Sequence, residues 1–125
     1  MILVDTSVWI DHLRRGNPAL AALLLDRQVL THPWVTGEIA LGNLSNRVGV
    51  LGLLGNLSQA AVATDTELRT LIDRHRLYGR GIGYVDAQLL AATMLTSGSL
   101  LWSRDKRLAA IAAELGIAHD QAQAP

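Results

Sequence analysis

The sequence has no cysteine, no phenylalanine and no excess of either charge. Without cysteine the chain forms neither a disulfide nor a thiolate-based zinc site or nucleophile. No apolar stretch reaches the roughly 18 residues of a membrane-spanning helix, and no charged segment of a secretion signal precedes the first apolar run. We therefore expect a cytoplasmic protein without a membrane segment. The balance of eleven basic and eleven acidic residues argues, at first sight, against a nucleic-acid partner.

Half of the 125 residues are hydrophobic, which fits one domain over residues 1–125 with a buried core. Apolar runs typical of buried strands alternate with helical patterns, which predicts an α/β fold with a parallel sheet of four to five strands and right-handed crossovers. Residues 121–125 are expected to be a tail. The predicted strands lie at 1–4, 29–32, 60–63 and 99–103, with a last edge strand at 117–119.

Two helices between these strands have clear sequence signals. Thr64 and Glu67 have the spacing of a capping box, which predicts a helix start. Apolar residues from Trp34 onward recur at helical spacing as far as Leu44, and Pro33 precedes them. This pattern predicts a helix that carries Glu38 in its early turns.

Four acidic residues are expected at the carboxyl edge of the sheet, where open α/β sheets bind ligands. Asp5 and Asp105 directly follow the two most apolar strands, which we expect to be the central pair. Glu38 and Asp86 lie in the early turns of helices that begin at the same edge. A structural alternative is open for three of them, because Asp5 is a favoured N-cap residue and Asp86 and Asp105 are stabilising near helix N-termini.

These four acids, brought together, repel one another unless a cation neutralises them. An all-oxygen cluster suits Mg²⁺ or Mn²⁺ rather than zinc, and the four histidines lack metal-ligand spacing. We therefore predict a divalent metal site made of the four acids. Ser7 and Ser103, which lie near two of them, are expected to orient a ligand or a bound water, or equally to cap helices.

Basic residues gather in two groups, at positions 69–80 and 104–107. Ten of the eleven basic residues are arginine, which suits bidentate contacts with phosphate. The first group is equally consistent with a solvated helix face.

Four short motifs occur in chain order at the positions of the four acids. They are Asp5-Thr6-Ser7-Val8-Trp9-Ile10, Thr36-Gly37-Glu38-Ile39-Ala40, Gly81-Ile82-Gly83-Tyr84-Val85-Asp86-Ala87 and Leu101-Trp102-Ser103-Arg104-Asp105-Lys106-Arg107-Leu108. Together they resemble the PIN domain, and in detail the VapC-type toxins of bacterial toxin–antitoxin pairs. The resemblance runs along nearly the whole chain and implies a three-layer α/β/α domain. It places the four acids at the family's catalytic, metal-ligating positions, Ser7 at its small hydroxyl and Ser103 where many members have threonine.

The resemblance implies a Mg²⁺- or Mn²⁺-dependent endoribonuclease that acts as a toxin, forms a homodimer and pairs with a cognate VapB-type antitoxin. In such an enzyme the metal generates a nucleophile from bound water and offsets charge in the transition state. Arg80, Arg104 and Lys106 are candidates for contacts with the RNA backbone. Three tryptophans and two tyrosines are too few for a broad base-stacking platform.

Other functions remain open at this point. One alternative is a PIN-like module that binds RNA or a partner without cleavage, although the presence of all four acids argues against it. Another is a metal-dependent phosphatase or DNA nuclease with a similar site. A phosphoaspartate mechanism is disfavoured, because Ser7 rather than a second acid stands two residues after Asp5.

Overall fold

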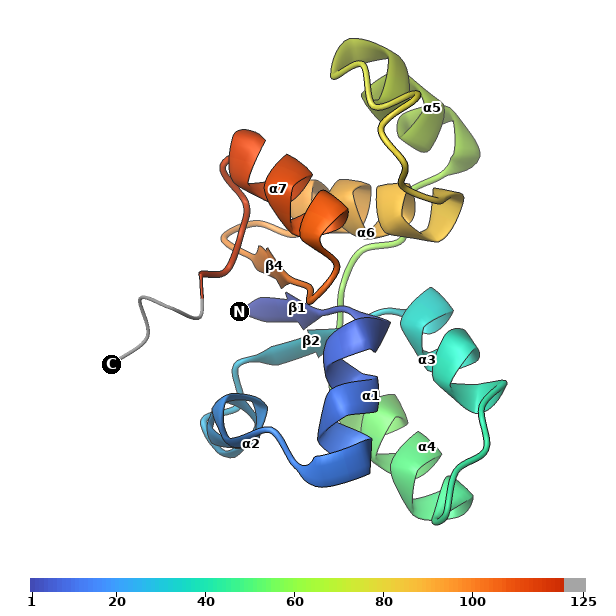
Figure 1. The fold of residues 1–125 in the computed structure, drawn as a ribbon, viewed down its shortest axis with the longest axis vertical. Coiled ribbons are helices and arrows are strands. Elements are labelled where there is room, and N and C mark those ends of the chain that lie inside the picture. Colours follow the sequence, from blue (N-terminus) through green and yellow to red (C-terminus); the bar gives the residue numbers. More distant parts are fainter. Residues whose placement is uncertain (121–125) are drawn as a thin grey trace.

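The computed structural model describes residues 1–120, in which a four-stranded parallel sheet lies between two groups of helices (Figure 1). The strands follow the order β3-β2-β1-β4. They are β1 (Ile2–Val4), β2 (Val29–Thr31), β3 (Ser58–Gln59) and β4 (Leu100–Trp102). The predicted α/β class is therefore confirmed, and the tail expected at residues 121–125 lies outside the described residues.

Strand β1 takes a central position because its three apolar residues are buried from both faces of the sheet. Ile2 pairs with Val29 of β2 on one side and with Leu100 of β4 on the other. The two strands that precede Asp5 and Asp105, β1 and β4, are thus neighbours. They are not the central pair as expected, because the central strands are β1 and β2, and β3 and β4 are the outer strands. The expected last edge strand is reduced to one parallel bridge between Leu101 and Ala118.

The third strand lies earlier than the prediction of residues 60–63. The residues of β3 pair with Leu30 and Thr31 of β2, and only Ala60 extends this pairing, by donating its N–H to the carbonyl oxygen of Thr31 at 2.8 Å. Both residues of β3 are exposed. Because hydrogen bonds rather than buried side chains of its own hold this strand, no apolar pattern marks it in the sequence.

Helices cover both faces of the sheet. They are α1 (Thr6–Arg15), α2 (Pro18–Leu25), α3 (Pro33–Ala40), α4 (Arg47–Asn56), α5 (Asp65–Arg74), α6 (Tyr84–Leu95) and α7 (Lys106–Glu114). The chain moves across the sheet from β1 to β3 through α1–α4 and returns to β4 through α5 and α6. Right-handed crossovers then require the two groups to lie on opposite faces, and Figure 1 shows α1–α4 on one side and α5–α7 on the other. This is the three-layer arrangement that the resemblance implied.

Local signals explain where two of these helices begin and end. At the start of α5, the Thr64 hydroxyl accepts the N–H of Glu67 at 3.1 Å and the Glu67 carboxylate accepts the N–H of Thr64 at 2.9 Å, which confirms the predicted capping box. Helix α3 ends at Ala40, earlier than the apolar pattern suggested. Leu41 is 90% exposed, so it does not continue the apolar face of that helix.

The carboxyl ends of the parallel strands meet at one edge of the sheet, on the side toward which the arrows point in Figure 1. Helices α1, α3 and α7 begin there, directly after β1, β2 and β4, and α6 begins on the same side. Among residues 1–120, no helix combines the length and the apolar character needed to cross a membrane.

Candidate active site

The four predicted acids all lie at this edge, at or near the beginning of a helix. Asp5 and Asp105 are the residues immediately before α1 and α7. Asp86 lies in the first turn of α6 and Glu38 in the second turn of α3. Asp5 is 6% exposed and Asp86 is half-buried, whereas Glu38 and Asp105 are exposed. The fold thus brings to one edge four acids that are far apart in the sequence.

The negative charges of the other three acids affect the pKa of Asp86. Burial raises the pKa of Asp86 above its ordinary value, and the hydrogen bond from the N–H of Gly83 opposes this effect. The negative charges of Asp5, Asp105 and Glu38 each raise the pKa of Asp86 further. Carboxylates act on one another in this way only when they are close, so each of the other three acids lies near Asp86.

Two of the carboxylates cap the helices on which they lie, each through one oxygen. Asp86 Oδ2 accepts the N–H of Gly83 at 3.0 Å. Asp105 Oδ1 accepts the N–H groups of Arg107 at 2.9 Å and Leu108 at 3.2 Å. The capping roles considered from the sequence are therefore real. They leave Asp86 Oδ1 and Asp105 Oδ2 without a hydrogen-bond donor among the described residues.

The other two carboxylates are held by hydroxyl groups. Ser7 and Ser103 each donate to Asp5 Oδ2 at 2.7 Å, and although Asp5 occupies the N-cap position of α1, its side chain makes no capping bond. Thr6 donates to Glu38 Oε1 at 2.7 Å. Within residues 1–120, Asp5 Oδ1 and Glu38 Oε2 receive no hydrogen bond. All four acids therefore present one oxygen that the protein does not use.

The two serine hydroxyls also fix the turn after β4 against the start of α1. Ser7 Oγ accepts the N–H of Arg104 at 3.0 Å, and Ser103 Oγ accepts the N–H of Asp105 at 3.0 Å. Since both hydroxyl protons are directed at Asp5, the serine lone pairs are available for these N–H groups. Neither serine caps a helix. Both instead position Asp5 and the main chain next to Asp105.

The four acids fit a hard divalent cation by their chemistry, but their present spacing does not make a finished site. Four carboxylates with a free oxygen each supply the ligands that Mg²⁺ and Mn²⁺ prefer. In the described part of the chain, no three Asp, Glu, His or Cys side chains are close enough to hold an ion as they stand. Enclosing an ion requires side-chain rotation, for which the exposed Glu38 and Asp105 have room.

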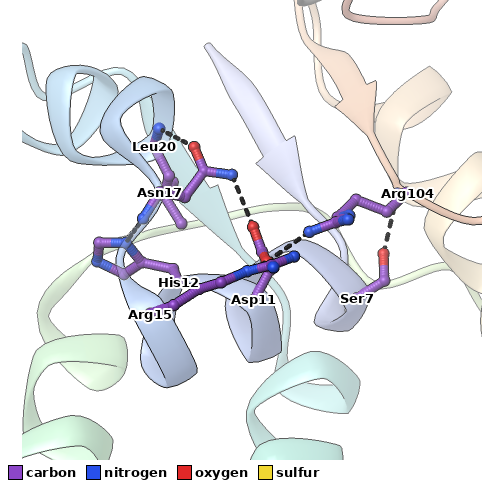
Figure 2. Close-up of polar contacts among 7 residues, drawn as sticks. All are labelled: Ser7, Asp11, His12, Arg15, Asn17, Leu20 and Arg104. Atoms are coloured by element: carbon purple, nitrogen blue, oxygen red, sulfur yellow. Dashed lines mark hydrogen bonds and ion pairs between the residues drawn. The ribbon is translucent and has the colours of Figure 1, made fainter.

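Next to the acids, Asp11 of α1 forms a polar cluster that the sequence analysis did not identify (Figure 2). Its carboxylate accepts hydrogen bonds from Arg15 at 2.6 Å, Arg104 at 2.5 Å and Asn17 at 3.1 Å. The hydrogen bond from Arg15 is the main reason that the pKa of Asp11 falls to about 2, with Arg104 and Asn17 adding to it against the effect of burial. The four-residue spacing of Asp11 and Arg15 on one helix was the only sequence signal for this cluster, whereas the pairing of Asp11 with Arg104 depends on the fold.

Two of the three residues predicted to bind RNA are committed to acidic partners. Arg104 forms the ion pair just described and remains 46% exposed. Arg80 makes a bidentate contact with Glu114, at 2.7 and 2.8 Å, at the end of α7 that is remote from Asp105. Lys106 begins α7 and has no ion pair within residues 1–120. Arg104 and Lys106 thus flank the site on either side of Asp105, while Arg80 is held away from it.

A buried hydrogen-bonded hub links the two helices that carry Glu38 and Asp86. Gln88 of α6 is 1% exposed, and its Oε1 accepts the N–H of Ala63 at 2.8 Å and lies 3.3 Å from Nε2 of His32, the N-cap of α3. His32 Nδ1 accepts the N–H of Trp34 at 3.0 Å, so the ring proton is on Nε2 and is donated to Gln88. Sequence reasoning missed this hub, because nothing in the local pattern distinguishes Gln88 from a surface glutamine.

Comparison with known proteins agrees with the four motifs. The family model of the PIN domain matches residues 2–114 of the chain. The chain therefore belongs to the PIN domain family. Ribonuclease VapC32 of Mycobacterium tuberculosis, from each of two strains, is 52% identical over 118 residues, which are 94% of this chain and 95% of the relative. This similarity confirms the VapC-type resemblance predicted from the motifs.

Two solved structures share the fold. FitAcB from Neisseria gonorrhoeae superposes with a TM-score of 0.63 at 20% identity, over 94% of this chain and 95% of that one. PAE2754 from Pyrobaculum aerophilum superposes with a TM-score of 0.58 at 16% identity, over 92% of this chain and 88% of that one. At such low identity the two structures show the common fold, and the VapC32 relative carries the functional comparison.

Proposed function

We propose that the chain is a divalent-metal-dependent endoribonuclease that hydrolyses RNA phosphodiester bonds and acts as the toxin of a toxin–antitoxin pair. The observation that carries this proposal is the 52% identity, along nearly the whole chain, to a relative named as a ribonuclease. The four acids at one sheet edge support it, because each retains an oxygen that the protein does not use.

In this proposal Asp5, Glu38, Asp86 and Asp105 are the residues that hold Mg²⁺ or Mn²⁺. When bound, the ion lowers the pKa of a bound water and offsets negative charge on the reacting phosphate. The chain's own contribution is to hold the ligands. The hydroxyls of Ser7 and Ser103 fix the Asp5 carboxylate, and main-chain N–H groups fix Asp86 and Asp105. Thr6 does the same for Glu38.

Arg104 and Lys106 are placed beside Asp105, where an RNA backbone would pass. Their contribution to binding is electrostatic and insensitive to sequence, so it should weaken as salt increases. Arg80 contributes less in this proposal, since Glu114 holds its guanidinium at the end of α7 remote from Asp105. Arg104 is paired as well, with Asp11, so Lys106 is the one of the three without an ion pair among residues 1–120.

Cleavage of a defined single-stranded RNA by the purified protein, with Mg²⁺, Mn²⁺ or EDTA, tests the proposal. Asp5→Asn should lower the cleavage rate by a factor of about 100 or more, because it removes a ligand charge while the amide oxygen can still accept the serine hydroxyls. Asp26→Asn is the matched control, since Asp26 is exposed and lies at the far end of α2, and it should cleave like the wild type. Cleavage that survives in EDTA, or in the Asp5→Asn variant, would overturn the metal-site assignment.

Parallel reactions on DNA and on nitrophenyl phosphate separate the remaining functions. Hydrolysis of either substrate in preference to RNA would favour a DNA nuclease or a phosphatase. Binding of RNA without hydrolysis of any of the three substrates would favour a non-cleaving module. Induced expression in a bacterial host, followed by sequencing of new RNA 5′ ends, would identify the natural cleavage site.

We also propose a cognate VapB-type antitoxin and a homodimer as partners, from the family resemblance and the name of the VapC32 relative. Co-expression with the candidate antitoxin and size-exclusion chromatography with light scattering test both. The expected result is a dimer of this chain whose ribonuclease activity is lost when the antitoxin is bound. The cytoplasmic location expected from the sequence stays a prediction.

A further inference from the structure

Two aromatic side chains on the helices that carry Glu38 and Asp86 touch each other at the sheet edge where these helices begin. Trp34 lies one turn before Glu38 on α3, and Tyr84 lies two residues before Asp86 on α6. Their ring centroids are 6.0 Å apart with an angle of 42° between the planes. The contact therefore joins the two helices that carry Glu38 and Asp86.

Both rings of this pair are open to solvent, and so is Tyr78, which is 65% exposed in the loop between α5 and α6. Tyr84 is 46% exposed and Trp34 is half-buried, whereas Trp9 and Trp102 are 1% and 4% exposed. A pocket of about 140 Å³ lies against both rings and is also lined by residues of α5 and α6. Two aromatic faces that touch each other at the edge where the acids lie are suited to a binding role, because an aromatic ring offers a large apolar face to a flat ligand.

Both rings are held in place without a ligand. The Tyr84 hydroxyl donates a hydrogen bond to Asp65 Oδ1, and Asp65 is in turn paired with Arg69 at 3.1 Å. Trp34 meets the ring of the buried His32 edge to face, at 6.1 Å and 87°. Because their orientations are fixed in advance, a flat ligand that stacks on them loses little of its binding energy to ordering of the rings.

We propose that Trp34 and Tyr84 form a binding site for one unpaired base of the RNA, which stacks on the exposed ring of Tyr84 with Trp34 at its edge. The proposal rests on the ribonuclease function proposed above, since it specifies how that site takes its substrate. Stacking on an aromatic ring tolerates any base and contributes about 1–3 kcal/mol by alanine substitution in proteins that bind single strands. A single site of this kind is compatible with the small number of aromatic residues. It also selects unpaired RNA over a duplex, in which the bases are already stacked.

Tryptophan fluorescence tests base binding separately from cleavage. The protein is the Asp5→Asn variant in Mg²⁺, and the probes are a short single-stranded RNA of random sequence and an abasic strand of the same length. We expect the RNA to quench the fluorescence and the abasic strand to leave it unchanged, because Trp9 and Trp102 are buried and Trp34 is the tryptophan that a base can reach. Trp34→Leu, in the same background, should remove the response. Equal quenching by the abasic strand, or no quenching by RNA, would overturn the proposal.

Cleavage kinetics give the second readout. Tyr84→Leu should lower kcat/KM on single-stranded RNA by about 5- to 150-fold, the factor that corresponds to one stacked base. Tyr84→Phe keeps the ring and loses only the hydroxyl that orients it, so its loss of activity should be smaller than that of Tyr84→Leu. If Tyr84→Leu fails to fold, as judged by circular dichroism, the fluorescence experiment still decides the matter.

The two proposals fail in different ways. A wild type that cleaves RNA, with Tyr84→Leu cleaving equally well, would refute the base-binding site and leave the ribonuclease function standing. Quenching by RNA but not by the abasic strand, in a wild type that cleaves nothing, would support the base-binding site and refute the ribonuclease.

Discussion

Replacing the buried Gln88 by leucine should destabilise the protein by roughly 3–7 kcal/mol. The Gln88 amide accepts the N–H of Ala63 at 2.8 Å, donates to the carbonyl oxygen of Ala63 at 3.1 Å and accepts a longer bond of 3.3 Å from His32. Leucine has a similar volume but satisfies none of these groups, so three buried polar groups lose their partner. Each such group costs about 1–3 kcal/mol, and the longer bond belongs at the low end of that range.

Urea unfolding followed by circular dichroism measures this loss. The midpoint should fall while the slope stays the same, because the surface exposed on unfolding does not change. A loss of this size is a large part of the roughly 5–15 kcal/mol that stabilises a typical domain. Gln59→Leu makes the same chemical change at an exposed site, where water can replace the side-chain hydrogen bonds to the carbonyl oxygens of Leu57 at 3.1 Å and Leu54 at 3.4 Å, so it should cost no more than about 1 kcal/mol. A Gln88→Leu variant as stable as Gln59→Leu would refute the idea that this amide joins the two helices.

Three further predictions concern pH and the hydroxyl groups. Burial lowers the pKa of His32 from its ordinary value of 6.5, so the unfolded chain takes up a proton more readily than the folded chain. The melting temperature should therefore fall as the pH drops below 6.5, and a melting temperature that stays constant there would contradict this. The arginines around Asp11 lower its pKa from 3.8 to about 2, so the Asp11 carboxylate stabilises the fold at neutral pH. The difference in melting temperature between the wild type and Asp11→Asn should therefore become smaller as the pH falls from about 4 toward 2. The double variant Ser7→Ala/Ser103→Ala should lower the rate of Mg²⁺-dependent cleavage about 10- to 100-fold, because Asp5 loses both hydroxyls that hold it. Ser45→Ala, at an exposed position, is the neutral control. Full activity of the double variant would show that the hydroxyls do not position Asp5.

The sheet edge could be predicted from the sequence because its signals are local. One continuous apolar run ends directly before Asp5 and another ends at Trp102, shortly before Asp105, and topology alone sends the ends of parallel strands to the same edge. The capping box of α5 was equally readable. Strand β3 was placed too late, because Ser58 and Gln59 are exposed and polar and their pairing depends on the main chain of β2. The relative positions of β2 and β4 were likewise not encoded in either strand alone.

Within the site, the sequence identified residues by charge and position but not the partners that hold them. Arg80 was selected because it is basic, and its neutralising partner Glu114 lies 34 residues away along the chain. Thr6 stood inside the first motif without a role, since its contact with Glu38 spans 32 residues. Pairings of this kind are set by how helices pack on the two faces of the sheet, which single-sequence periodicity does not specify.

The arrangement of the four acids is difficult to explain by fold stability alone. Helix capping accounts for one oxygen of Asp86 and one of Asp105, but it does not account for a buried Asp5 whose side chain caps nothing and is instead held by two serine hydroxyls. Burial is the main reason that the pKa of Asp86 is raised, and the charges of the other three acids raise it further, which is an unfavourable interaction that neutral residues would avoid. A divalent cation converts that repulsion into attraction, so metal binding should stabilise the fold by about 2.7 kcal/mol at an ion concentration 100 times the dissociation constant. An Asp5→Asn variant should lose this gain, and a melting temperature equally raised by Mn²⁺ in the variant and the wild type would place the ion elsewhere.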